Sequence, residues 1–92
     1  MKKGNTTQTY TTSVTRTSVK VEYRVTTDAE GAVTAIFGTA RKNDAVVGYV
    51  NYERPNDRAH LSFEPYTGLT LRERKAVACA ALADIEAITT EE

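Results

Sequence analysis

The segment "ERPNDRAH", residues 53–60, holds the residue types from which acid–base chemistry could be built. In general acid–base catalysis one side chain gives a proton, another takes it, and a third orients them. Glu53, Asp57 and His60 could fill these roles if the fold brought them into one pocket. The same residues are also typical of a solvated hairpin loop. We therefore expect no catalytic residue here and a protein that is not an enzyme.

The other motifs of catalysis and cofactor binding are missing from the sequence. It contains no Gly-rich phosphate loop, no HExxH metal motif and no nucleophile motif. His60 is the single histidine and Cys79 the single cysteine, so no thiolate cluster or internal disulfide can form. Cys79 lies in the run "AVACAALA", where we expect a small buried thiol. The sequence predicts no cofactor, no metal and no small-molecule ligand.

Length and composition restrict the class of protein. The 92 residues suffice for one domain with a single core. Lys plus Arg and Asp plus Glu number 12 each, so the overall charge favours neither a nucleic acid nor a membrane surface. The first residues lack the apolar run of a signal peptide, and no stretch is apolar enough to span a bilayer. We therefore expect a cytoplasmic protein without membrane contact.

Hydrophobic periodicity predicts an α+β domain, in which a four-stranded antiparallel β-meander is followed by one long C-terminal α-helix (ββββα). Apolar and polar residues alternate from Val19 to Thr26, as in a strand with one buried face. Turn sequences separate strand-like runs at residues 19–26, 32–42, 45–53 and 60–64. Thr70 and Glu73 fit a helix capping box. The apolar stripe expected behind it comprises Leu71, Ala78, Ala81, Leu82, Ile85 and Ile88.

The segment before this domain is rich in threonine. Nine of the fourteen residues from Asn5 to Ser18 are Thr or Ser, which favour extended backbone but offer little to bury. We expect residues 1–17 to form a flexible N-terminal tail or an extension of the first strand, and residues 18–92 to form the single ββββα domain.

The two shortest turns predict which side chains share a face of the sheet. A two-residue turn, "ND", places Lys42 opposite Ala45, and a three-residue loop ending in Gly31 places Asp28 opposite Ala32. Counting outward from both turns gives one consistent apolar face, which the helix stripe would cover. Its expected members are Val21, Tyr23, Val25, Val33, Ala35, Phe37, Val46, Val50 and Tyr52, joined by Leu61 and Phe63.

The opposite face is then predicted to have a polar margin and an apolar centre formed by Ile36, Ala40, Val47 and Tyr49. An apolar centre inside a polar rim is typical of an interaction surface. One helix is also too narrow to cover four strands, so self-association would shield the sheet further. We expect a non-catalytic binding or regulatory module that meets a protein partner through this face, most simply a second copy in a twofold homodimer.

The alternative hypothesis is single-stranded nucleic-acid binding through the same face. Single-strand binders stack bases on exposed aromatic rings and hold the phosphates with nearby cations. The chain's candidate contacts are Lys20, Arg24, Lys42, Tyr49 and His60. Carboxylates expected on this face would repel phosphates, namely Glu22, Glu53 and Glu64. In strand and helix order the chain resembles single repeats of the Whirly and PUR groups of single-strand binders, although none of their residue motifs is present.

Overall fold

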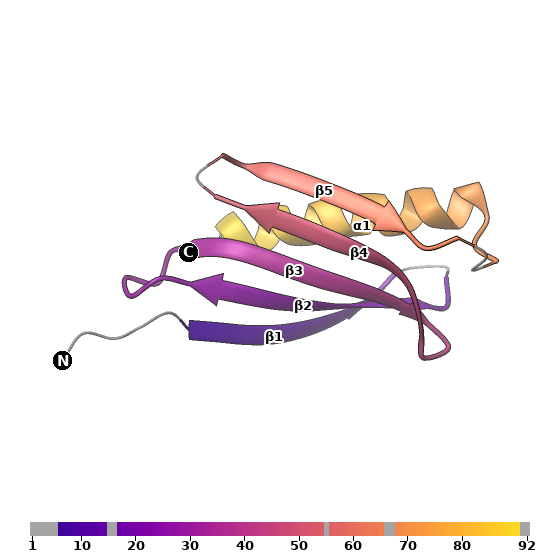
Figure 1. The fold of residues 1–92 in the computed structure, drawn as a ribbon, viewed down its shortest axis with the longest axis horizontal. Coiled ribbons are helices and arrows are strands. Elements are labelled where there is room, and N and C mark those ends of the chain that lie inside the picture. Colours follow the sequence, from indigo (N-terminus) through magenta and orange to yellow (C-terminus); the bar gives the residue numbers. More distant parts are fainter. Residues whose placement is uncertain (1–5, 15–16, 55, 66–67, 91–92) are drawn as a thin grey trace.

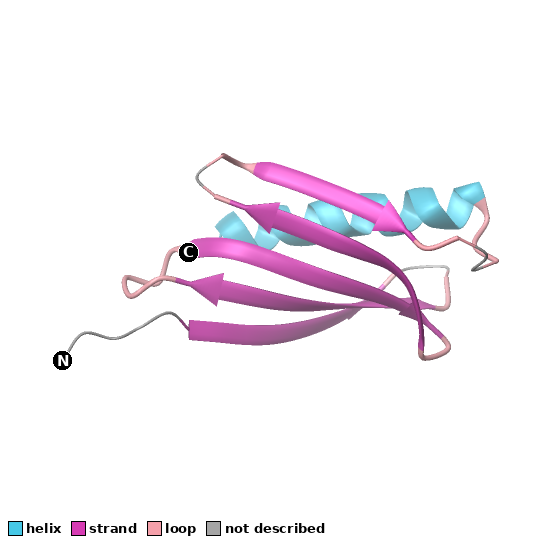
Figure 2. Cartoon of the chain, in the orientation of Figure 1, coloured by secondary structure: helices cyan, strands magenta, loops and turns pink. Residues whose placement is uncertain are grey.

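The computed structural model describes residues 6–14, 17–54, 56–65 and 68–90, and it contains five strands and one helix (Figure 1, Figure 2). The elements are β1 (Thr6–Ser13), β2 (Val19–Thr27), β3 (Val33–Lys42), β4 (Ala45–Glu53), β5 (Arg58–Phe63) and α1 (Leu71–Thr90). The strands form one antiparallel sheet in the order β1-β2-β3-β4-β5. The helix lies behind this sheet in Figure 1. The α+β class with an antiparallel sheet is therefore confirmed.

The prediction of four strands is wrong, because the Thr-rich segment forms β1. Its residues pair with β2 along their whole length, from Thr6 opposite Thr27 to Ser13 opposite Lys20. Threonine favours extended backbone, and a ladder to a neighbouring strand satisfies that backbone even where the side chains bury little. Residues 1–5 of the predicted tail lie outside the described part of the chain.

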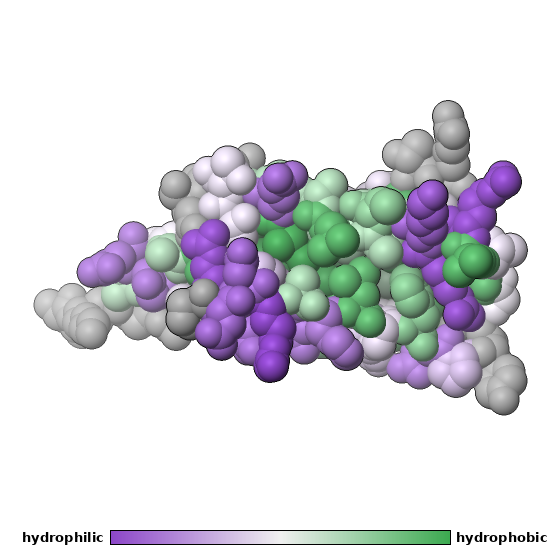
Figure 3. All heavy atoms as spheres, turned by 90° about the horizontal axis from the view of Figure 1, so that it is seen from above, coloured by the Kyte–Doolittle hydropathy of each residue, from purple (hydrophilic) through white to green (hydrophobic). Residues whose placement is uncertain are grey.

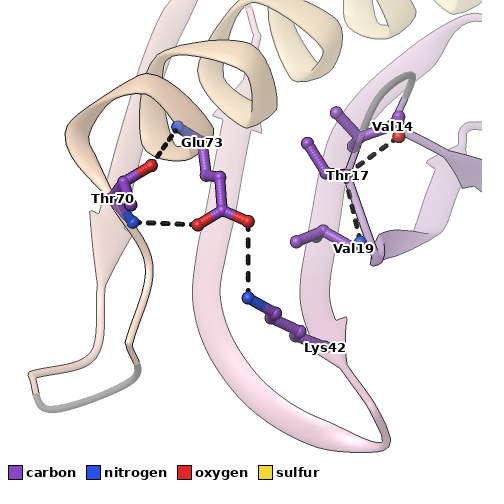
Figure 4. A network of polar contacts seen from close by, with 6 residues as sticks. All are labelled: Val14, Thr17, Val19, Lys42, Thr70 and Glu73. Atoms are coloured by element: carbon purple, nitrogen blue, oxygen red, sulfur yellow. Dashed lines mark hydrogen bonds and ion pairs between the residues drawn. The ribbon is translucent and has the colours of Figure 1, made fainter.

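A short loop ties β1 to β2 (Figure 4). The Val14 N–H donates to the Val19 carbonyl at 2.9 Å, the Thr17 hydroxyl donates to the Val14 carbonyl at 2.9 Å, and the Val19 N–H donates to the Thr17 hydroxyl at 3.0 Å. Val14 and Val19 are both buried. The loop therefore closes that end of the core as well as reversing the chain.

Both turn predictions are confirmed. The Asp28 N–H donates to the Ala32 carbonyl at 2.9 Å, and Gly31 adopts a φ of 89° that a side chain would strain. In the second turn Asn43 and Asp44 have φ values of 53° and 69°, and Lys42 lies opposite Ala45. Turn chemistry alone therefore located both hairpins correctly.

Beyond each turn a β-bulge changes the register. The first bulge lies in β3. Thr27 of β2 pairs with Val33, but the next residue of β2, Thr26, pairs with Ala35, so Thr34 of β3 is the extra residue. Its carbonyl instead accepts from the backbone N–H of Arg54 at 3.0 Å. A bulge puts two residues of one strand against one of its partner. From here on, β3 side chains point to the opposite face from the one predicted.

The second bulge lies in β4. Arg41 faces Val46 but Ala40 faces Gly48, which makes Val47 the extra residue. The Val47 carbonyl accepts from the Glu64 N–H at 2.9 Å. This second bulge offsets the first, so the remainder of β4 has the same inward side chains that the turns alone would give.

The two bulges correct the predicted sorting of side chains on β3 and β4. Phe37 is 40 % exposed while Val50 is buried, so they point to opposite sides of the sheet. Ile36, Ala40 and Val47 belong to the core, and the prediction that they form the centre of the outer face is wrong. Of the residues predicted for the inner face of the sheet, six are buried and two are partly buried beside them. The buried ones are Val21, Tyr23, Val25, Val33, Val50 and Tyr52, and the partly buried ones are Leu61 and Phe63.

The helix begins with the predicted capping box (Figure 4). The Glu73 N–H donates to the Thr70 hydroxyl at 3.1 Å, and the Thr70 N–H donates to the Glu73 carboxylate at 3.0 Å. These two bonds satisfy N–H groups that have no partner within the helix. The bond from Thr70 and a second bond from Lys42 Nζ at 3.3 Å lower the pKa of Glu73.

The helix crosses the strands diagonally. Near its start, Glu73 reaches Lys42 at the end of β3, and the Arg74 guanidinium lies 5.8 Å from the ring centroid of Phe63 on β5. Near its end, Asp84 accepts hydrogen bonds from the hydroxyls of Thr12 on β1 and Tyr23 on β2. The inner side of β5 is consequently covered only at its C-terminal end.

The helix buries a narrower stripe than predicted. Val77, Ala81 and Ile85 are its buried residues. Leu71 and Leu82 are 82 % and 49 % exposed, so their predicted place in the core is wrong. Cys79 is also exposed rather than buried, because it lies on the side of the helix that faces away from the sheet.

Candidate functional site

An aromatic pair lies near the centre of the sheet face that points away from the helix. The rings of Phe37 and Tyr49 are stacked, with centroids 6.0 Å apart and planes inclined by 30°. Phe37 faces Asn51 directly, and Tyr49 faces Thr39, so the two rings meet across the diagonal of the strand pair. They are 40 % and 37 % exposed. Each ring therefore keeps part of its surface open to solvent.

Unpaired cations lie beside this aromatic pair on β2. Arg24 is directly opposite Phe37, and Lys20 lies four residues earlier on the same face. Both side chains are exposed, and neither forms an ion pair within the described residues. Their charges are therefore available to an anion that lies against the β2 side of Phe37.

The other charges of this outer face largely balance one another. Arg41 lies 3.5 Å from Glu22, and Arg58 lies 3.6 Å from Glu53. All four side chains are well exposed, so these pairs are weak and can exchange partners. Glu64 is exposed at the β5 side. Positive charge is consequently in excess beside β2 and not beside β5.

A shallow depression runs from Phe37 toward the end of the face where β1 joins β2. One hollow, of about 120 Å³, is lined by Thr9, Glu22, Arg24, Phe37, Thr39 and Arg41. An adjoining hollow, of about 280 Å³, shares three of these residues and extends to Thr11, Ser18, Lys20, Asn43 and Asp44. Hydroxyl groups and cations line both hollows, together with the carboxylates of Glu22, which is paired with Arg41, and Asp44. Such a surface suits an elongated polar ligand better than a compact apolar one.

The structure brings four of the five predicted nucleic-acid contacts to this face. Lys20, Arg24, Tyr49 and His60 are exposed on it. Lys42 is different, because its Nζ donates to Glu73 on the helix side of the sheet. Their proposed role in binding stays a prediction.

Sequence reasoning missed Phe37 and Arg41. A register-independent signal for the aromatic ring was nevertheless present. Ile36 and Phe37 are consecutive apolar residues in a strand, so one of them must face outward whatever the register. The pattern could not tell which of the two it would be.

The residues considered for acid–base chemistry do not converge. Glu53 and His60 line a hollow of about 460 Å³ on the outer face. Asp57 instead accepts a hydrogen bond from the hydroxyl of Tyr52, whose ring is buried on the inner face. Arg54 Nε also donates to that hydroxyl, at 3.1 Å. The segment thus holds its own loop together.

The described residues form neither a metal-binding cluster nor a membrane-spanning helix. Within residues 6–14, 17–54, 56–65 and 68–90, no three His, Cys, Asp or Glu side chains lie close enough together to hold a metal ion. No helix in that part of the chain combines the length and apolar character needed to cross a bilayer. Comparison with known proteins finds no matching protein family, no similar curated protein and no similar solved structure.

Proposed function

We propose that this protein binds single-stranded nucleic acid across the outer face of its sheet. The observation that carries the proposal is the exposed stacked pair of Phe37 and Tyr49 on the same face as Lys20 and Arg24, two cations without an ion-pair partner among the described residues. Aromatic rings on a sheet accept unpaired bases by stacking, and neighbouring cations neutralise the phosphates. Double-stranded nucleic acid hides its base faces and could not use the rings in this way.

The distribution of charge suggests how the strand would lie. Phosphates would follow β2 and the adjoining depression, where Lys20, Arg24 and Arg41 are located. The bases would then point toward the two rings on β3 and β4. Glu64 disfavours a path along β5. Stacking with little base-edge contact implies weak sequence preference.

A protein partner on the same face is the less favoured function. Three of the four residues proposed as its apolar centre, Ile36, Ala40 and Val47, are buried. The exposed apolar surface that remains there is centred on two aromatic rings. Two aromatic rings with exposed cations on the neighbouring strand match a nucleic acid better than they match the larger apolar core of a protein interface.

Fluorescence anisotropy with labelled oligothymidine tests the proposal. Phe37→Ala and Tyr49→Ala should each weaken binding by about 1–3 kcal/mol, the usual loss for one stacked base. The matched control is Tyr10→Ala, because Tyr10 is similarly exposed (45 %) but lies on the inner face of β1. Absence of binding at low salt, or equal loss in the control variant, would refute the proposal.

The salt dependence tests the role of the cations separately. Each phosphate contact on a single strand contributes about −0.7 to the slope of log K against log salt concentration. Lys20→Ala with Arg24→Ala should reduce the steepness of that slope by about 1.4. Lys75→Ala, on the exposed side of the helix, should leave it unchanged.

A further inference from the structure

Strand β5 forms an open edge of the sheet beside an apolar surface. Nothing in Figure 1 lies above β5, and the view from that side in Figure 3 shows apolar residues gathered in the middle of the molecule. Leu61 and Phe63 on β5 are only partly buried. An open strand edge with apolar side chains beside it can pair with another strand.

The exposed flank of the helix enlarges this apolar surface. Successive helical residues are about 100° apart, which places Leu71, Ala78 and Leu82 on one flank of α1. The other flank carries Asp84, which bonds to β1 and β2, so the leucine flank faces β4 and β5. Leu82 is exposed there because the diagonal helix leaves the inner side of β5 partly uncovered, and Leu71 is exposed at the first residue of the helix.

The hydrogen bonds of β5 show which backbone groups are free at the edge. The Glu64 N–H donates to the Val47 carbonyl of β4. Residues of an antiparallel strand bond alternately to the neighbours on its two sides. Ser62 and His60 therefore also bond to β4, whereas the N–H and C=O groups of Phe63, Leu61 and Ala59 point outward from the sheet.

We propose that a second copy of this chain pairs here, β5 against β5 in antiparallel orientation around a twofold axis at Leu61. In this register Ala59 lies opposite Phe63 of the second copy, so all three outward-pointing residues pair. A shift of two residues would place Phe63 opposite Asp57, which is in a turn at a φ of 55°, or Ala59 opposite Pro65, which has no N–H. The Leu61 register is therefore the longest ladder that the edge allows.

Side chains match in the same register. On the inner side Leu61 meets its own copy, and the Phe63 ring of the second copy lies over the small Ala59, on the side where Leu82 is exposed. On the outer side Arg58 lies opposite Glu64 of the second copy, and the twofold axis repeats this pair of opposite charges. Both strands carry these residues in the order required for self-complementarity.

This dimer goes beyond the proposed function and does not depend on it. It would join the two sheets into one of ten strands, with two Phe37–Tyr49 pairs on a continuous outer face. Oligomeric state and oligonucleotide binding are measured separately, so either proposal can fail while the other survives.

Sedimentation equilibrium of the full chain tests the interface. Arg58→Glu and Glu64→Arg each create two like-charge contacts and should weaken the dimer about tenfold. Mixing the two variants restores opposite charges at both contacts and should give a heterodimer of near wild-type affinity. This rescue requires Arg58 to lie against Glu64 of the second copy.

A helix variant provides the second test. Leu82→Glu should abolish the dimer at concentrations where wild type is dimeric, without unfolding the chain, because the side chain is 49 % exposed. Ala83→Glu, at an exposed position on the face of the helix away from the sheet, is the matched control and should leave the dimer intact. A wild-type monomer at 100 µM would overturn the proposal. So would a dimer that neither Arg58→Glu nor Leu82→Glu weakens, or binding of an unrelated extended peptide in place of a second copy.

Discussion

Two adjacent residues provide a direct test of the bulged register. Ile36 is fully buried and Phe37 is 40 % exposed. Ile36→Thr removes two buried carbons, worth about 1.6 kcal/mol at about 0.8 kcal/mol each, and buries a hydroxyl at a further cost of about 1–3 kcal/mol. We therefore expect a loss of about 3–4 kcal/mol in the free energy of unfolding. A domain of this size has about 5–14 kcal/mol in total.

Phe37→Thr places the same side chain on the outer face, where water satisfies the hydroxyl. It loses the stacking on Tyr49 and part of the ring's contact area, which should cost about 1–2 kcal/mol. Threonine suits strands at both positions, so the comparison isolates burial. Urea denaturation should show a midpoint about 2 M lower for Ile36→Thr, and a shift of about half that size or less for Phe37→Thr.

The order of the two losses decides the question. A register without bulges would put Phe37 in the core and Ile36 in water. In that register Phe37→Thr would cost more stability than Ile36→Thr. A larger loss for Phe37→Thr than for Ile36→Thr would therefore refute the face assignment and remove the aromatic pair from the outer surface.

Three further predictions concern the framework that holds this face. Burial, together with the 2.7 Å hydrogen bond to Asp84, raises the pKa of Tyr23 above its ordinary value of 10.0. The folded state therefore favours the protonated phenol, and this contribution to stability is present below pH 10.0 and is lost as the pH rises above that value. Tyr23→Phe should consequently flatten the decline of the urea midpoint between about pH 9 and 11. Thr70→Ala removes the helix cap and should cost about 1 kcal/mol in chemical denaturation. Gly48→Ala would put a Cβ 2.7 Å from the Ser62 carbonyl oxygen and should lower stability by about 1–3 kcal/mol, measured by thermal unfolding.

Local chemistry made most of the fold predictable. The alternation around Tyr23, the positive-φ residues of the two turns and the Thr70–Glu73 capping box each act within a few residues, and each is confirmed. Strand β1 was missed because its threonines give no apolar alternation. Its order comes from backbone pairing with β2, which a sequence pattern does not display.

The candidate site was only partly predictable, because bulges depend on contacts distant in sequence. The carbonyl oxygens of Thr34 and Val47 accept hydrogen bonds from the backbone N–H groups of Arg54 and Glu64, which lie on other segments of the chain. Counting from the turns therefore succeeded for Val50, beyond both bulges, and failed between them. The outward orientation of Lys20 and Arg24 on β2 did not depend on counting from the turns, since β2 alternates regularly and contains no extra residue.

The two bulges have a consequence for how this chain tolerates insertions and deletions. Deletion of Thr34 would make the pairs Thr27–Val33 and Thr26–Ala35 consecutive, and deletion of Val47 would do the same for Arg41–Val46 and Ala40–Gly48. All other residues would keep their partners, so their side chains would keep their present faces of the sheet. Each position is therefore a point where the chain can gain or lose one residue without turning over the strands beyond it.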